Sequence, residues 1–345
     1  MEYSGTNLQP FIYGLPWFGT ETDFKLQRFP TSTLPKLPVA VQHLATHPAG
    51  GVIRFRAQTK IIAFELNRPP EQSMTAFSQV GQYGIDFYRD GLWMGVLAIR
   101  EGYQNIWIET DVNQVHEYAV YLPTYSPLEI RTLALEGDYP GVPEDGPEML
   151  PPSPYKVRGR IVVYGSSITQ GAFASRVGLA YPARIGRAID AEVVNLGMAG
   201  AGKGEHEVSD LLAKISGVSM YIMDWGANIA DPKEVQLIRE RYAYMIDKIR
   251  KQYPKVPIIY VNPQSLMMES LTPEPKHSFE IIRDTIQKNY ENEKKAGKPC
   301  AFVEGRDFIR PGDWDCLIDG AHCNDLGFDR YVTALVPVIK QFLKK

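Results

Sequence analysis

The stretch Arg160-Ile161-Val162-Val163-Tyr164-Gly165-Ser166-Ser167 decides the fold of the second half of the chain. Four apolar residues stand in a row and are followed at once by a glycine and two serines. A short apolar run that ends in turn residues is typical of a strand buried on both faces. The sequence therefore predicts a parallel sheet whose first strand ends at exposed hydroxyl groups.

Four more runs of this kind follow, and segments of helical periodicity separate them. The strand runs cover residues 192–196, 220–223, 257–261 and 301–303, and the helical segments cover about 181–189, 206–215, 233–252, 277–296 and 325–343. Strands that alternate with helices build a parallel sheet covered on both faces. We therefore expect a three-layer α/β domain over residues 158–345.

The first half of the chain has a different pattern. Residues 53–57 and 62–66 alternate apolar with other side chains, which favours half-buried strands. Further β-branched or aromatic runs cover 92–99, 103–108, 116–122 and 130–135, and one helix is expected at 39–46. Short strands at this spacing predict an all-β sandwich over residues 1–139. Six prolines between 140 and 154 then predict a linker over 140–157.

Composition excludes several classes of protein. The 345 residues are 44% hydrophobic and 22% charged, which excludes a disordered chain. The net charge of −3 argues against a nucleic-acid partner, and no apolar run reaches the roughly 18 residues of a membrane span. Three cysteines do not make a disulfide scaffold, and the N-terminus carries no signal-peptide pattern. We expect a cytoplasmic protein; whether it forms a homo-oligomer stays open.

A nucleophile and its base are candidates at two loops. Ser166-Ser167 follows the first strand, and ligands of open α/β sheets bind at such strand ends. Asp319-Gly320-Ala321-His322 precedes the last helix and can supply an imidazole base with a carboxylate to orient it. On its own the serine segment fits a simple helix cap equally well.

Donors for a developing oxyanion are candidates at two more strand ends. Asn195-Leu196-Gly197 follows the second strand, and Gly226-Ala227-Asn228 follows the third. A backbone N–H at Gly197 and the amide of Asn228 could stabilise negative charge on a substrate oxygen. Either residue alone is equally compatible with an ordinary turn.

Taken together, these four segments resemble, in order, the motifs of the SGNH (GDSL-type) hydrolases. The resemblance covers about residues 158–343 and departs from the family at Ser166 and Ile229, where aspartate is usual. It implies a flavodoxin-like three-layer domain with Ser167 as nucleophile, His322 as base and Asp319 as its orienting carboxylate. It also implies an oxyanion hole formed by Ser167, Gly197 and Asn228.

The first half has a resemblance of its own. Gly84-Ile85-Asp86-Phe87-Tyr88 is similar to the Gly-x-Asp-Leu-Tyr segment of a β-domain that precedes some bacterial SGNH domains. The resemblance implies a jelly-roll-like sandwich. A turn shaped by Asp86 and Tyr88 is an equally good explanation of this motif.

Metal and cofactor chemistry is not expected. Cys316, His322 and Cys323 lack the second close pair of ligands found in structural zinc sites, so we predict no metal and no cofactor. The predicted function is a serine esterase that removes a short acyl group, acetyl being the expected one, from a carbohydrate-like or small-molecule alcohol. Two alternatives stay open: an acyltransferase that uses the same three residues, and a catalytically inactive carbohydrate-binding protein.

Overall fold

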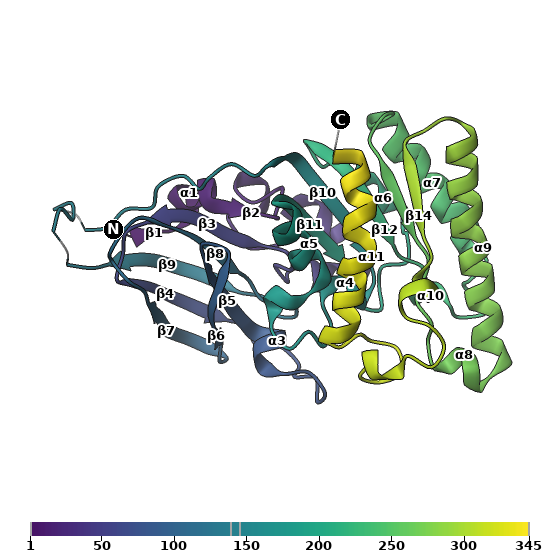
Figure 1. Ribbon diagram of the computed structural model, residues 1–345, viewed down its shortest axis with the longest axis horizontal. Helices are drawn as coiled ribbons and strands as arrows, with labels where there is room; N and C mark the ends of the chain where they lie inside the picture. The colour runs from purple at the N-terminus through teal and green to yellow at the C-terminus, as the bar shows by residue number, and fades with distance from the viewer. Residues whose placement is uncertain (1, 139, 145, 344–345) are drawn as a thin grey trace. The chain divides into compact units, whose positions relative to one another are not determined.

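The computed structural model describes residues 2–138, 140–144 and 146–343, which form two compact units (Figure 1). Unit 1 contains the described residues up to Leu34, the described residues of the range 45–155, and the short segment Arg176–Gly178. Unit 2 contains Pro35–Leu44, Lys156–Ser175 and the described residues from Leu179 onward. The predicted domain bounds at 139 and 345 lie outside the described residues, and the predicted division at 140–157 stays a prediction.

Unit 1 is built from two antiparallel sheets. One has the strand order β1-β9-β4-β7 and the other β2-β3-β8-β5-β6. The strands are β1 (Glu2–Tyr3), β2 (Ile12–Tyr13), β3 (Val52–Ala57), β4 (Ile61–Arg68), β5 (Gly84–Arg89), β6 (Leu92–Ala98), β7 (Gly102–Glu109), β8 (His116–Tyr121) and β9 (Glu129–Glu136). Along β4, Ile62, Phe64 and Leu66 are buried while Glu65 is exposed, so alternate side chains form the core. The predicted sandwich is confirmed.

Asp86 of the Gly-x-Asp-Leu-Tyr-like motif is fully buried in unit 1. Its Oδ2 accepts hydrogen bonds from Arg176 Nη1 at 2.6 Å and from the Gly178 N–H at 3.0 Å. Arg176 also donates to the Tyr88 hydroxyl at 2.6 Å. A Cβ atom at Gly178 would lie only 2.5 Å from Asp86 Oδ2, so glycine is needed there. The motif therefore binds the segment Arg176–Gly178 within unit 1.

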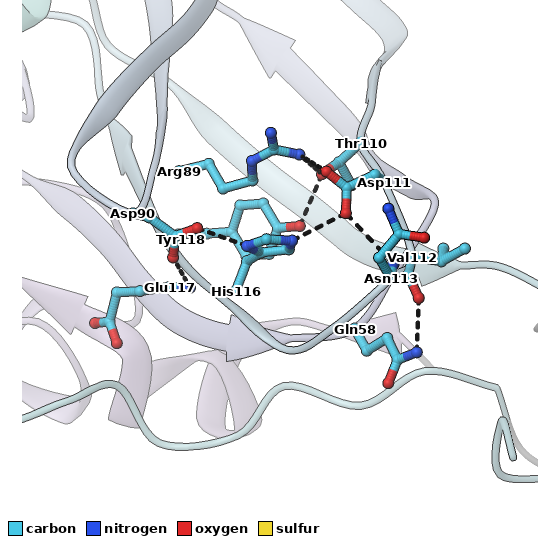
Figure 2. A network of polar contacts seen from close by, with 10 residues as sticks. All are labelled: Gln58, Arg89, Asp90, Thr110, Asp111, Val112, Asn113, His116, Glu117 and Tyr118. Atoms are coloured by element: carbon cyan, nitrogen blue, oxygen red, sulfur yellow. Dashed lines mark hydrogen bonds and ion pairs between the residues drawn. The ribbon is translucent and has the colours of Figure 1, made fainter.

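A second polar cluster of unit 1 surrounds His116 (Figure 2). Its Nδ1 lies 2.5 Å from Asp90 Oδ2, and its Nε2 lies 3.0 Å from Asp111 Oδ1. Arg89 donates to the other oxygen of Asp111. Both nitrogens of the imidazole ring are therefore within hydrogen-bond distance of a carboxylate. The cluster joins the β5–β6 turn to the connection between β7 and β8.

The sheet of unit 2 is parallel throughout and has the order β11-β10-β12-β13-β14. Its strands are β10 (Val157–Gly165), β11 (Ala191–Gly197), β12 (Val218–Asp224), β13 (Ile258–Val261) and β14 (Cys300–Val303). Counted within the domain, this is the order 2-1-3-4-5 of flavodoxin-like folds, which place ligands at the carboxyl ends of the strands where the order reverses. The predicted fold class is confirmed.

Helices cover both faces of this sheet (Figure 1). The long ones are α5 (Tyr181–Ile189), α6 (His206–Lys214), α7 (Leu237–Gln252), α9 (Pro273–Lys295) and α11 (Asp325–Leu343). One face packs aliphatic side chains such as Ile161 and Ile222 against α5 and α11. On the other face the rings of Trp225 and Tyr242 stack 4.4 Å apart. Three layers follow from strands that are apolar on both sides.

Three short helices of unit 2 have no counterpart among the predicted segments. They are α4 (Ser167–Gln170), α8 (Met268–Leu271) and α10 (Gly305–Phe308). Each has four residues, about one turn, and one turn shows no periodicity in a sequence. In the part of the chain that the structure describes, no helix has both the length and the apolar character needed to cross a membrane.

Candidate active site

The turn between β10 and α4 presents Ser167 as the first residue of the helix. Ser166 is the N-cap, and its side chain accepts a hydrogen bond from the Ile168 N–H. Serine and aspartate cap helices about equally well, so the departure from the family pattern at Ser166 preserves a capping side chain. Gly165 leaves no room for a side chain, because a Cβ there would meet Thr169 Oγ1 at 1.9 Å. The tight turn thus depends on glycine.

Ser167, His322 and Asp319 form a continuous hydrogen-bonded chain. Ser167 Oγ lies 2.8 Å from His322 Nε2, and His322 Nδ1 lies 2.7 Å from Asp319 Oδ2. The two loops are 155 residues apart in sequence. The arrangement can move a proton from the serine hydroxyl to the imidazole while the carboxylate holds the ring.

The loop that carries His322 is fixed by hydrogen bonds that sequence reasoning did not find. Gln264 donates to the Ala321 carbonyl at 2.7 Å, and the Met267 N–H donates to the Gly320 carbonyl at 2.8 Å. Cys323 Sγ donates to Gln264 Oε1 at 3.1 Å. Phe173 packs against the imidazole of His322 with ring centroids 5.1 Å apart. No spacing in the sequence links Gln264, Met267 or Phe173 to His322.

Asp319 is also held by its own loop. Its Oδ1 accepts the backbone N–H groups of Ala321 at 3.0 Å and of His322 at 2.8 Å. Partial burial acts to raise the pKa of Asp319, but the hydrogen bonds from the His322 N–H and ring outweigh it, and the pKa is lowered. The group is therefore ionised at neutral pH and can stabilise a protonated imidazole.

Asn228 lies beside this chain on the turn that follows β12. Its Nδ2 donates one hydrogen bond, 2.9 Å long, to the Met198 carbonyl. A side-chain amide has two N–H donors, so one remains for a ligand. Ser167, Asn228 and His322 all line one cavity of about 390 Å³. These three predicted site residues are thus brought together.

Gly197 differs from its predicted role. Its N–H donates to Asn195 Oδ1 at 2.8 Å, and a Cβ on Gly197 would lie 2.0 Å from the backbone nitrogen of Gln170. The side chain of Asn195 takes the donor that was assigned to the oxyanion hole. Gly197 instead allows β11 and α4 to pack closely.

Gly200 is better placed than Gly197 to offer a backbone N–H to a substrate oxygen. It has a φ of +66° and is exposed in the turn Met198–Ala201, whose first carbonyl binds Asn228. Among the described residues, no acceptor receives its N–H. The sequence shows both glycines after the strand. Only the structure distinguishes their roles, because Asn195 accepts the N–H of Gly197 and not that of Gly200.

A buried carboxylate lies behind the serine turn. Asp224 Oδ2 accepts hydrogen bonds from Thr169 Oγ1 at 3.0 Å and from the Tyr181 hydroxyl at 2.8 Å. Burial raises the pKa of Asp224 to about 7, although both hydrogen bonds act to lower it. Thr169 belongs to the same short helix as Ser167. The sequence signal was an acidic residue at a strand end.

The chain belongs to the GDSL-like lipase/acylhydrolase family, whose model matches residues 158–340. Residues 4–135 match the model of the N-terminal domain found in SGNH-hydrolase-type esterases. Membership of this family makes the protein a carboxylic ester hydrolase. None of the curated proteins compared with the chain matches it.

Solved structures agree with this assignment. A Bacteroides ovatus protein described as a GDSL-like lipase is 28% identical, with a TM-score of 0.84 over 100% of this chain and 98% of that one. A salicylyl-acyltransferase from a tetracycline biosynthetic pathway is 14% identical, with a TM-score of 0.79 and coverage of 92% and 91%. A family two carbohydrate esterase from Clostridium thermocellum is 13% identical, with a TM-score of 0.63 and coverage of 85% and 92%. The last two share the fold.

Proposed function

We propose that the protein hydrolyses esters through an acyl-enzyme formed on Ser167. His322 Nε2 takes the hydroxyl proton as Ser167 Oγ bonds to the acyl carbon, and Asp319 stabilises the imidazolium. The tetrahedral intermediate collapses, the alcohol leaves with the proton from His322, and the acyl group stays on Ser167. Water then repeats both steps and releases the acid. The Ser167–His322 distance of 2.8 Å is the observation that carries the proposal.

The negative oxygen of the intermediate needs donors. We assign this role to the Ser167 N–H, to the second N–H of Asn228, and to the Gly200 N–H in place of Gly197. The Asn228 amide is held by the same turn that contains Gly200, so the two donors have a common support. Donors fixed before the reaction stabilise the transition state without reorganisation.

The substrate we propose is a short acyl ester of a carbohydrate-like or small-molecule alcohol. A carbohydrate esterase solved with cellohexaose has the same fold, which supports the alcohol part by analogy only. Transfer to an alcohol in place of water is the second candidate, favoured by the fold shared with a salicylyl-acyltransferase. Products analysed with and without acceptor alcohols separate the two. The cytoplasmic location stays a prediction.

The test is labelling and turnover in matched variants. A fluorophosphonate probe should label wild type at Ser167, and Ser167→Ala and His322→Ala should each lose nearly all ester hydrolysis while keeping the fold. Removing both residues should be little worse than removing either, because they act as a unit. Ser73→Ala changes an exposed serine of unit 1 and should leave activity unchanged. Folded wild-type protein that neither reacts with the probe nor turns over esters would instead indicate the inactive binding protein.

A further inference from the structure

The cavity beside Ser167 and His322 is mainly apolar over the rest of its wall. The apolar part is built from the turn after β12, the segment that leads into α8 together with the first residue of α8, and the start of α9. Its residues include Ala230, Pro232, Leu266, Met268, Pro275 and Phe279. Binding of an apolar group against this wall removes apolar surface from water, which is favourable. The wall therefore selects an apolar group.

The volume of about 390 Å³ is large for an acetyl group. It corresponds to roughly a dozen water molecules at about 30 Å³ each, and it falls within the range of cavities that hold small organic ligands. An acetyl group has a single methyl beyond its carbonyl. It would leave most of the apolar wall in contact with water.

Apolar side chains also stand exposed around this cavity. Met268, which lines it, is 45% exposed, and the nearby Met267 and Leu271 are 38% and 70% exposed. The Met267 N–H donates a hydrogen bond to the carbonyl of Gly320, which lies in the loop that carries His322. Exposed apolar side chains grouped beside a cavity are typical of a binding site. The apolar surface therefore continues from the cavity to its surroundings.

Charge excludes a second class of acyl group. No lysine or arginine is among the described residues of the wall, and Asp231 is its one carboxylate. An acyl group that ends in a carboxylate would meet a like charge without a cation to bind it. We propose that the acyl site takes an uncharged apolar acyl group larger than acetyl. This inference rests on the proposed esterase function and names its acyl specificity.

The experiment compares p-nitrophenyl esters that differ only in the acyl group: acetate, butanoate, hexanoate, benzoate and the succinate half-ester. Each methylene that enters an apolar wall should raise kcat/KM about fourfold. Hexanoate is therefore expected at least tenfold above acetate, and succinate below butanoate. The rate with benzoate, compared with that of hexanoate, shows whether the site prefers an aromatic or a straight-chain acyl group. The proposal includes both kinds.

Matched variants show whether this cavity is responsible. Ala230→Phe fills the cavity and should lower the hexanoate-to-acetate ratio of kcat/KM at least tenfold. Ala230→Leu fills less of the cavity and should lower this ratio less strongly. It replaces Ala230→Phe in the test if the phenylalanine variant does not fold. Ala243→Phe places the same ring on an exposed position of α7 and should keep the wild-type ratio. All rates are normalised to sites titrated with fluorophosphonate.

The outcomes distinguish the two proposals. If acetate is the best substrate, or if Ala230→Phe and Ala230→Leu both keep the wild-type ratio, the esterase function stands and the acyl inference is overturned. If the fluorophosphonate does not react with Ser167 and no ester is cleaved, the esterase function and the acyl inference are both overturned. A ratio that rises with acyl length and falls in the filled variants supports both.

Discussion

Asn228 connects the turn Met198–Ala201 to the cavity that Ser167 lines, using one N–H for the Met198 carbonyl. If the other N–H binds the developing oxyanion, Asn228→Ala should lower kcat by about 10²–10³, with little change in KM. Asn228→Asp should be at least as damaging, because it places negative charge where negative charge develops. Active-site titration together with thermal melts provides the measurement. A less stable Asn228→Ala protein with unchanged turnover per site would make Asn228 a turn residue only.

Asp224 predicts how stability depends on pH. Its folded pKa of about 7 lies above the unfolded value near 3.8, so the folded state binds more protons between these values. The contribution of Asp224 to the free energy of unfolding is fully present below about pH 4 and is lost as the pH rises through 7. Its size is on the order of a few kcal/mol.

Asp224→Asn should remove this part of the pH dependence while keeping an oxygen that can accept from Thr169 and Tyr181. Chemical denaturation at pH 5 and pH 8 measures it. Asp284→Asn, at an exposed position of α9, is the control and should leave the slope as in wild type. An unchanged slope in Asp224→Asn would contradict a raised pKa at this carboxyl.

At the scale of elements, two glycines after β11 have different tasks. A methyl group on Gly197 would overlap the backbone of α4, whereas one on Gly200 would meet open space. Gly197→Ala should therefore displace α4 and lower both the melting temperature and the activity. Gly200→Ala adds only the strain of its φ of +66°, about 1–2 kcal/mol, and should keep most of the activity per folded molecule.

Thermal melts and rates per titrated site separate the two glycines. Equal losses of activity in both variants, with no loss of stability, would contradict the close packing of β11 against α4. A stable and fully active Gly197→Ala would do the same.

At the scale of the whole molecule, each unit includes a segment from the other half of the chain. Unit 2 contains Pro35–Leu44, where Leu37, Val41 and Leu44 are buried, and unit 1 contains Arg176–Gly178. A fragment of residues 156–345 lacks those three side chains, whose burial is worth roughly 5–9 kcal/mol in total. That is comparable to the stability of a whole domain. The fragment should therefore aggregate or unfold at temperatures where the full chain stays folded.

Substitutions in the full chain test the same segment. Val41→Ala should lower the free energy of unfolding by about 2 kcal/mol, because Val41 is fully buried. Val39, two residues earlier on the same helix α2 (Val39–Ala45), is 81% exposed, and Val39→Ala should have little effect. A fragment with the full chain's melting temperature would show that Pro35–Leu44 contributes nothing to unit 2.

The sequence by itself determined the fold class and most elements, because periodicity and turn chemistry are local. The runs 192–196 and 220–223 lie within β11 and β12, and the helical segments 181–189 and 325–343 agree with α5 and α11. β5 was not among the predicted strand runs because nearly all its residues are buried, which removes the alternation. Family motifs then named Ser167, Asn228, Asp319 and His322.

Only the tertiary structure decided which of these groups meet. Ser167 and His322 are 155 residues apart, and their contact depends on the parallel sheet bringing strand ends to one edge. The Gly197 N–H is held by Asn195, which no motif indicated, and the cavity wall combines three separate segments. Hydrogen bonding and cavity shape are properties of side chains packed in space. Spacing along the chain therefore names candidate groups, whereas packing decides their roles.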